Sequence, residues 1–169
     1  MVHSVELLFD PDTESAIRRV WERLSELGLR SPALTSRPHV TMIVADDVAP
    51  DVDEPLVAVT RRLPLRCVVG APMLFGGSTF VLVRLVVASA ELLAVQAEAL
   101  RVCLPYLTPG PAPNTLAGQW TPHVTLARRV EPGQLARALT VRKLTREIKG
   151  DIVGLRRWDG NKRIEYPIG

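Results

Sequence analysis

The sequence predicts an α+β fold in which one unit is used twice, and three observations support this. Short β-prone runs alternate with helical patterns along all 169 residues. The order strand, helix, strand, helix, strand occurs in both approximate halves, residues 1–78 and 79–169. The tetrapeptide Pro-His-Val-Thr occurs once in each half, at 38–41 and at 122–125. We therefore expect a single bilobal domain over residues 1–169, with two pseudo-twofold-related lobes whose antiparallel sheets surround a central cleft.

The first half begins with a β-prone run at 5–9, which the turn-forming sequence Asp10-Pro11-Asp12 ends. Apolar residues then recur at spacings of three and four up to Leu27, which predicts an amphipathic helix that stops at Gly28. The remaining elements expected in this half are a strand at 38–45, a helix at 52–62, and strands at 65–75 and 79–87 joined by a Gly76-Gly77 hairpin turn.

The strand at 79–87 also opens the second half, which repeats the order. A helix with apolar residues at helical spacing runs from Ala90 to about Leu104, where Pro105 ends it. A loop rich in Pro, Gly and Asn follows at 108–118. The elements expected after it are a strand at 122–127, a helix at 133–141, and strands at 147–155 and 163–168.

Composition narrows the class of protein. Apolar residues make up 47% of the chain, which is enough for a packed interior. No run approaches the roughly 20 apolar residues of a membrane helix, and no signal peptide is recognisable, so we expect a cytoplasmic monomer. Two isolated cysteines, Cys67 and Cys103, are expected to be buried, reduced thiols. Arginine outnumbers lysine eighteen to three, which suggests a GC-rich, bacterial genome.

The net charge of +3 is unevenly distributed. Residues 1–85 hold nine basic and eleven acidic side chains, and residues 86–169 hold twelve basic and seven acidic ones. Two interpretations of the basic residues near the end stay open: they attract phosphate, or they form an ordinary solvated surface. These residues are Arg142, Lys143, Arg146, Lys149, Arg156, Arg157, Lys162 and Arg163.

The repeated tetrapeptide places the same two side chains on one face of each strand. Alternate residues of a strand point the same way, so His39 and Thr41 share a face while Val40 points behind. The same holds for His123 and Thr125. If the halves are related by a pseudo-twofold axis, two imidazoles and two hydroxyls converge on one groove.

This set of side chains is suited to phosphodiester cleavage. Imidazole titrates near neutral pH, so one histidine can accept a proton while the other donates one. The hydroxyls of Thr41 and Thr125 can hydrogen-bond the non-bridging phosphate oxygens. A metal centre is disfavoured, because neither motif contains a Cys, Asp or Glu to complete the ligand set. The third histidine, His3, is expected at the surface or at a strand edge.

The motifs His39-Val40-Thr41 and His123-Val124-Thr125, each preceded by proline, resemble those of the 2H phosphoesterase superfamily. The resemblance is to its branch of 2′-5′ RNA ligase-like proteins, or RNA 2′,3′-cyclic phosphodiesterases, and it covers nearly the whole chain in layout. It implies a bilobal fold with a central cleft, and catalysis that needs no metal or nucleotide cofactor. It also implies that His39 and His123 are catalytic and that Thr41 and Thr125 bind phosphate, with an RNA end or a small nucleotide as substrate.

Further contacts and other functions stay open at this point. Arg37 and Arg128 flank the motif strands and are candidate substrate contacts, as is Trp120, three residues before His123. Trp120 is the first choice for stacking on a base, ahead of the other candidates Phe75, Phe80, Tyr106 and Trp158. Two alternatives are a non-catalytic RNA- or nucleotide-binding module and a phosphodiesterase for a small nucleotide derivative such as ADP-ribose cyclic phosphate.

Overall fold

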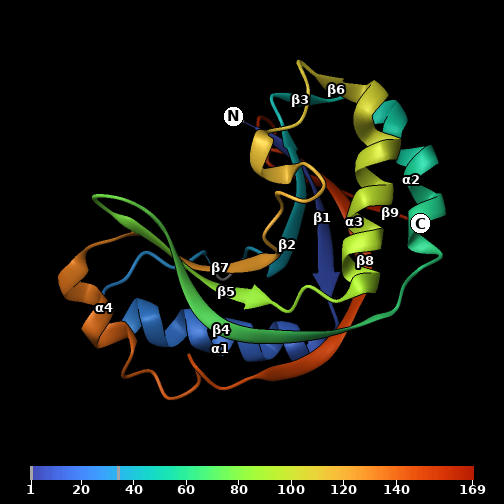
Figure 1. The fold of residues 1–169 in the computed structure, drawn as a ribbon. Coiled ribbons are helices and arrows are strands. Elements are labelled where there is room, and N and C mark those ends of the chain that lie inside the picture. Colours follow the sequence, from blue (N-terminus) through green and yellow to red (C-terminus); the bar gives the residue numbers. More distant parts are fainter. Residues whose placement is uncertain (1, 34) are drawn as a thin grey trace.

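The computed structural model describes residues 2–33 and 35–169 and has the predicted α+β architecture (Figure 1). The strands are β1 (His3–Phe9), β2 (His39–Ala45), β3 (Asp47–Val48), β4 (Leu65–Gly76), β5 (Phe80–Val86), β6 (Leu107–Thr108), β7 (His123–Val130), β8 (Ile148–Asp159) and β9 (Ile164–Ile168). The helices are α1 (Pro11–Glu26), α2 (Asp53–Thr60), α3 (Ala90–Cys103) and α4 (Pro132–Ala138), with short 3-10 turns at Pro50–Val52, Leu104–Tyr106 and Pro113–Thr115. Every expected helix and strand is present, with ends that differ by a few residues.

All pairings in the main sheet are antiparallel, in the order β2-β1-β8-β4-β5-β7, with β9 added beside β8. The sheet has two wings, one of β2, β1, β8 and β9 and the other of β4, β5 and β7. Pairing of β4 with β8 joins the wings into one seven-stranded sheet. The first wing therefore takes β8 and β9 from the second half of the sequence, and the other wing takes β4 from the first half.

The strands that carry the two motifs are the two ends of this sheet order, yet they contact each other. The sheet must therefore curve until its ends meet, which brings the starts of β2 and β7 to one place. In Figure 1 the two strands lie close together in the middle of the molecule, between the two groups of helices. The fold thus explains how motifs 84 residues apart come to share a site.

The helices also exchange between the halves. Helix α1, from the first half, packs against β7, and helix α3, from the second half, packs against β2. Helix α2 packs against α3 and against β8 and β9. No helix within the described residues is long and apolar enough to cross a membrane.

The start of α1 is fixed by Asp10. Its carboxylate accepts the backbone N–H groups of Asp12 and Thr13, as an N-cap does, and also that of Asp151 on β8, at 2.7 Å. The helix ends where Gly28 adopts a φ of +79°, a conformation that glycine takes without steric cost. The capping residue therefore ties the helix to the centre of the sheet.

Three buried side chains, two cysteines and one histidine, bear on the predictions. Cys67 and Cys103 are free and buried, as expected, and burial raises the pKa of each thiol to about 12. The expectation for His3 is wrong: only 5% of it is exposed, because it lies on the central strand β1 beside Asp47 and Asp159.

Arg84 on β5 is 1% exposed and donates to four backbone carbonyls, those of Val69, Gly70, Lys143 and Arg146.

Candidate active site

The two motif histidines are held in the same way. The Nδ1–H of His39 donates to the carbonyl of Arg37, and the Nδ1–H of His123 donates to the carbonyl of Thr121, both at 2.7 Å. In each case the acceptor lies two residues earlier, just before the strand begins. A hydrogen bond from Nδ1 selects the tautomer whose Nε2 carries a free lone pair when the ring is neutral. Each strand therefore presents an Nε2 atom for proton transfer.

The two histidines line two adjoining cavities, which together form the cleft. A cavity of about 900 Å³ is lined by His39, and a neighbouring cavity of about 420 Å³ is lined by His123. Three residues, Thr41, Val44 and Arg128, line both cavities, so the two spaces adjoin. Thr41 thus lies at the junction, and Thr125 lines the His123 side. The structure brings together all four residues of the two motifs.

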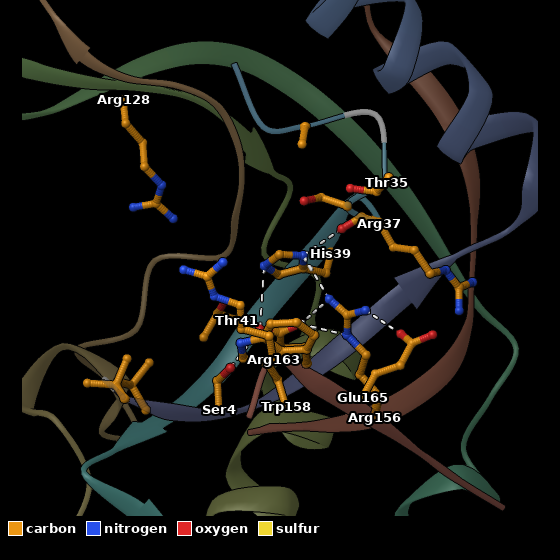
Figure 2. Close-up of a pocket in the computed structure, with 15 residues that line it drawn as sticks. Ser4, Thr35, Arg37, His39, Thr41, Arg128, Arg156, Trp158, Arg163 and Glu165 are labelled. Carbon is orange, nitrogen blue, oxygen red and sulfur yellow. Dashed lines mark hydrogen bonds and ion pairs between the residues drawn. The ribbon is translucent and has the colours of Figure 1, made fainter. Parts of the chain in front are cut away.

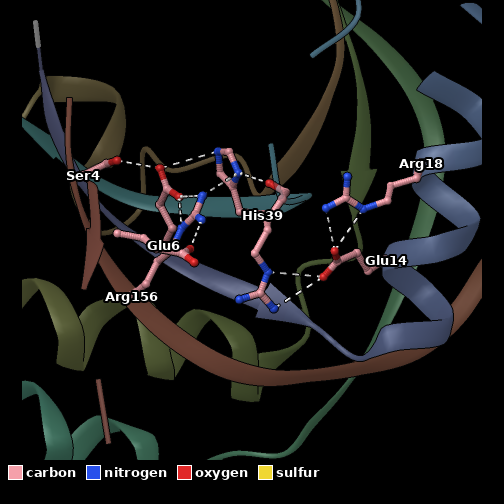
Figure 3. A network of polar contacts seen from close by, with 8 residues as sticks. Ser4, Glu6, Glu14, Arg18, His39 and Arg156 are labelled. Atoms are coloured by element: carbon pink, nitrogen blue, oxygen red, sulfur yellow. Dashed lines mark hydrogen bonds and ion pairs between the residues drawn. The ribbon is translucent and has the colours of Figure 1, made fainter. Parts of the chain in front are cut away.

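His39 belongs to a buried polar network (Figures 2 and 3). Its Nε2 lies 3.5 Å from Oε1 of Glu6, a carboxylate on β1 that is only 3% exposed. The guanidinium of Arg156 pairs with Glu6, with Nη2 2.6 Å and Nε 2.8 Å from Oε2, and Nη2 also lies 3.3 Å from Nδ1 of His39. Ser4 donates its hydroxyl to Glu6 at 2.6 Å, and Glu165 accepts from Arg156. Glu6 therefore places a negative charge beside both the imidazole of His39 and the guanidinium of Arg156.

The register of the sheet creates this network. Glu6 on β1 pairs with Thr41 on β2 on one side and with Arg156 on β8 on the other. Residues opposite each other in antiparallel strands point to the same face, so the three side chains form a row across the floor of the cleft. A bulge between Val5 and Glu6 sets the alignment with β2.

His123 has a different, more apolar environment. The ring of Phe75, on β4, contacts it edge-to-face, with the centroids 4.9 Å apart and an angle of 69° between the planes. Burial lowers the pKa of His123, and the positive charges of His39 and Arg128 lower it further, against the opposing effect of the hydrogen bond to Thr121. His123 therefore stays neutral to lower pH than an ordinary histidine does.

The three predicted substrate contacts lie in different settings. Arg37 lines the larger cavity, but its Nε and Nη2 face the carboxylate of Glu14 at 3.4 Å. Arg128 is exposed and lines both cavities, and its backbone N–H donates to Arg30 at 2.9 Å. Trp120 is 9% exposed and lines the smaller cavity, while its indole N–H donates to the Thr41 carbonyl at 2.8 Å.

The basic residues near the end of the sequence do not form one surface. Arg156 and Arg163 line the larger cavity of the cleft. The neighbouring Arg157 points away from Arg156 along the strand, where it pairs with Asp53 at 2.7 and 2.8 Å and lies over the ring of Tyr166. Arg142 and Lys143 lie beside α1 in a separate depression. Alternation along β8 therefore sends adjacent arginines to different places.

Two residues of the site have no counterpart in the motifs, Glu6 and Arg156. Glu6 interrupts the otherwise apolar run Val5 to Phe9, and a charged residue on a central strand is a signal of a partnered, buried group. Within the described residues, no group of three or more His, Cys, Asp or Glu side chains is arranged to hold a metal ion.

Comparison with solved structures supports the assignment of the fold. TT0787, a protein of Thermus thermophilus, aligns with a TM-score of 0.64 at 13% identity, covering 100% of this chain and 96% of that one. LigT of E. coli in its apo form aligns with a TM-score of 0.57 at 11% identity, covering 99% of this chain and 94% of that one. The PDE domain of MHV ns2 gives 0.56 at 15%, covering 99% of both chains. At these identities the likeness concerns the fold alone.

Sequence comparison identifies the family. No curated protein sequence matches the chain at a significant level. The family model described as the 2′-5′ RNA ligase superfamily matches residues 11–162, which include both histidine motifs and nine-tenths of the chain. The resemblance to the 2H phosphoesterases is thereby confirmed, and the chain belongs to the 2′-5′ RNA ligase superfamily.

Proposed function

We propose that this protein is a metal-independent phosphodiesterase that hydrolyses the 2′,3′-cyclic phosphate, or a 2′,5′-phosphodiester, of an RNA end or a small nucleotide. One observation carries the proposal. Two histidines from separate halves of the chain are anchored through Nδ1 in the same way and line one cleft, together with the two motif threonines. Such a pair supplies both proton transfers that cleavage of a phosphodiester needs.

Because the two imidazoles have different surroundings, we assign them different roles, one as proton acceptor and one as proton donor. His123, with its lowered pKa, is neutral at physiological pH, and its Nε2 takes a proton from the attacking water. The water oxygen bonds to phosphorus as the bond to one ribose oxygen breaks. His39, whose Nε2 lies 3.5 Å from the carboxylate of Glu6, acts as the general acid and gives a proton to that leaving oxygen. The products are a phosphomonoester and a free ribose hydroxyl, and both histidines regain their starting states by exchange with solvent.

The developing charge on the phosphate is stabilised from two sides. The hydroxyls of Thr41 and Thr125 are aimed by their strands at the same face as the histidines, and both line the cleft. The guanidinium of Arg128 lines both cavities and so lies near the junction. Groups fixed on strands keep their positions during the reaction. Electrostatic stabilisation of a transition state requires such preorganised groups.

The comparisons add support from similar folds. LigT of E. coli was solved in complex with 3′-AMP, with a TM-score of 0.55 to this chain, and the MHV ns2 domain is described as a PDE domain. A nucleotide-sized ligand is consistent with a cleft whose larger part has a volume of about 900 Å³. ADP-ribose cyclic phosphate is an alternative substrate with the same reacting group.

A panel of substrates tests the proposal. The protein, treated with EDTA, is incubated with nucleoside 2′,3′-cyclic phosphates, ADP-ribose cyclic phosphate and 2′,5′-linked dinucleotides, and the products are identified by phosphorus NMR. We expect conversion of a cyclic phosphate to a monoester, which also reveals whether the 2′ or the 3′ bond breaks. Salt-sensitive RNA binding with no turnover of any substrate would instead support the non-catalytic binding module.

A further inference from the structure

The two ends of the cleft differ in size and in charge. The smaller cavity, at His123, is lined by apolar side chains, by the amides of Asn114 and Gln119, and by a single arginine, Arg128. The larger cavity, at His39, is lined by four arginines and two glutamates. The larger cavity therefore has a formal excess of two positive charges in addition to His39. It has room for more than the scissile phosphate.

Most of these charges already have partners. Both glutamates, Glu6 and Glu165, are paired with Arg156. Arg37 faces Glu14, which also pairs with Arg18 at 2.8 Å. No ion pair or side-chain hydrogen bond among the described residues engages the guanidinium groups of Arg128 and Arg163. In Figure 2 these two side chains extend into the same cavity, Arg128 from β7 and Arg163 from the turn between β8 and β9.

Arg163 lies in a turn that hydrogen bonds to Asp159 hold together. It lies between β8 and β9 with a φ of +58°, in the left-handed region that residues other than glycine rarely adopt. Its backbone N–H donates to the carbonyl of Asp159 at 2.8 Å, and the buried carboxylate of Asp159 accepts the N–H groups of Asn161 and Lys162, both at 2.9 Å. Strained backbone held by such contacts is often found where a side chain must be aimed at a ligand.

We infer that Arg163 forms a second phosphate subsite at the His39 end of the cleft, separate from the scissile phosphate between the two histidines. The inference rests on the proposed function, because it takes the reacting phosphate to lie between the motifs. A guanidinium in a partly enclosed cavity binds phosphate through paired, charge-assisted hydrogen bonds. The preferred ligand is a nucleotide that carries another phosphate beyond its cyclic phosphate. A 5′-phosphate and an internucleotide phosphate both provide that chemistry.

Binding of product-like ligands tests the subsite independently of turnover. The affinities of adenosine 2′-phosphate and adenosine 2′,5′-bisphosphate are measured by titration calorimetry at one fixed ionic strength. We expect the bisphosphate to bind about tenfold more tightly, as one charge-assisted contact implies. Arg163→Asn should remove most of that difference, because asparagine tolerates the positive φ but lacks the charge.

Arg129→Asn is a matched control. Arg129 is also an exposed arginine with a positive φ, of 52°, but it lines neither cavity, so the same charge change should leave the tenfold difference in place. Equal affinities of the wild type for the two ligands would overturn the inference. So would a preference for the bisphosphate that Arg163→Asn and Arg129→Asn reduce equally, since that indicates only the overall charge.

Turnover then distinguishes the sources of the second phosphate. Adenosine 2′,3′-cyclic phosphate is compared with its 5′-phosphorylated form and with a dinucleotide that has a free 5′-hydroxyl and a cyclic phosphate end. A larger kcat/KM for the 5′-phosphorylated mononucleotide indicates a small nucleotide, and a larger kcat/KM for the dinucleotide indicates an RNA end. Tight binding of the bisphosphate without hydrolysis of any cyclic phosphate would contradict the proposed function and leave the subsite standing.

Discussion

The indole N–H of Trp120 donates to the backbone carbonyl of Thr41 at 2.8 Å, so a residue beside the second motif holds the first motif in place. The reciprocal contact exists on the other strand, where the indole N–H of Trp21 donates to the carbonyl of Thr125 at 2.9 Å. Trp21 lies on α1, in the first half of the chain. Each half therefore fixes the threonine strand of the other, at the point where β2 and β7 meet.

Trp120→Phe tests whether the contact positions the site. The change keeps an aromatic ring but removes the N–H, so the free energy of unfolding should fall by about 1 kcal/mol. Because Thr41 loses part of its support, kcat on a cyclic nucleotide should fall more than KM rises. Chemical denaturation and steady-state kinetics give the two quantities, and Trp21→Phe is the matched variant for Thr125. An unchanged kcat together with reduced stability would show that the contact is structural only.

The pH dependence should reflect the lowered pKa of His123. A base whose pKa is lowered stays neutral further into acid, so the acidic limb of the kcat/KM profile should lie below about pH 6.5, the ordinary value for histidine. The groups that face His123 are the ring of Phe75, the carbonyl of Thr121 and the charges of His39 and Arg128.

Phe75→Ala supplies the control for this profile. Removing the ring exposes His123 to water, which reduces the effect of burial, so the acidic limb should move back toward higher pH. A wild-type limb at or above pH 6.5, or one that Phe75→Ala does not move, would contradict the role of His123 as a half-buried, neutral base.

Glu6→Gln tests the role of the carboxylate beside His39. The variant keeps the shape of the side chain but removes its negative charge. In the wild type that charge lies 3.5 Å from Nε2 of His39, where a negative charge stabilises a protonated ring. We expect kcat/KM on a cyclic nucleotide to fall about tenfold, because the general acid loses the carboxylate beside it. Glu165→Gln is the control, because Glu165 contacts the same Arg156 without contacting His39. An equal fall in both variants would assign Glu6 a merely structural role.

Arg84→Met tests the buried arginine of β5. The substitution fills a similar volume but leaves the carbonyls of Val69, Gly70 and Arg146 without their donor. Unsatisfied buried carbonyls are costly, so the free energy of unfolding should fall by about 2–4 kcal/mol. Urea denaturation measures this value. A loss below about 1 kcal/mol would mean that water replaces the guanidinium at these carbonyls.

Most of the fold could be predicted from the sequence, because local patterns determine most of its elements. The spacing of Ile17, Val20 and Leu24 defined α1, and the turn at Gly76 separated β4 from β5. The pairing of β4 with β8 was not predictable in the same way. It joins residues far apart in the sequence, and alternation along a strand does not reveal its neighbour.

The candidate site was also only partly predictable. The histidines and threonines were found because the repeated tetrapeptide can be recognised in the sequence itself. Glu6 was missed, and Arg156 was named only as one of eight basic residues near the end of the sequence. The importance of both depends on register, because they meet only once β1 pairs with β8. Trp120 was expected to stack on a base, which nothing in the structure tests; the structure adds its hydrogen bond to Thr41.

The division of acid and base roles between His39 and His123 is tested most directly by changing the leaving group. Rates are measured with a nucleoside 2′,3′-cyclic phosphate, whose leaving alkoxide needs a proton, and with a p-nitrophenyl ester of the same nucleotide, whose leaving group departs without one. His39→Ala should lose at least about 100-fold on the cyclic phosphate and far less on the p-nitrophenyl ester, whereas His123→Ala should lose activity on both. Equal losses for His39→Ala on the two substrates, or the reverse pattern between the two histidines, would contradict the mechanism.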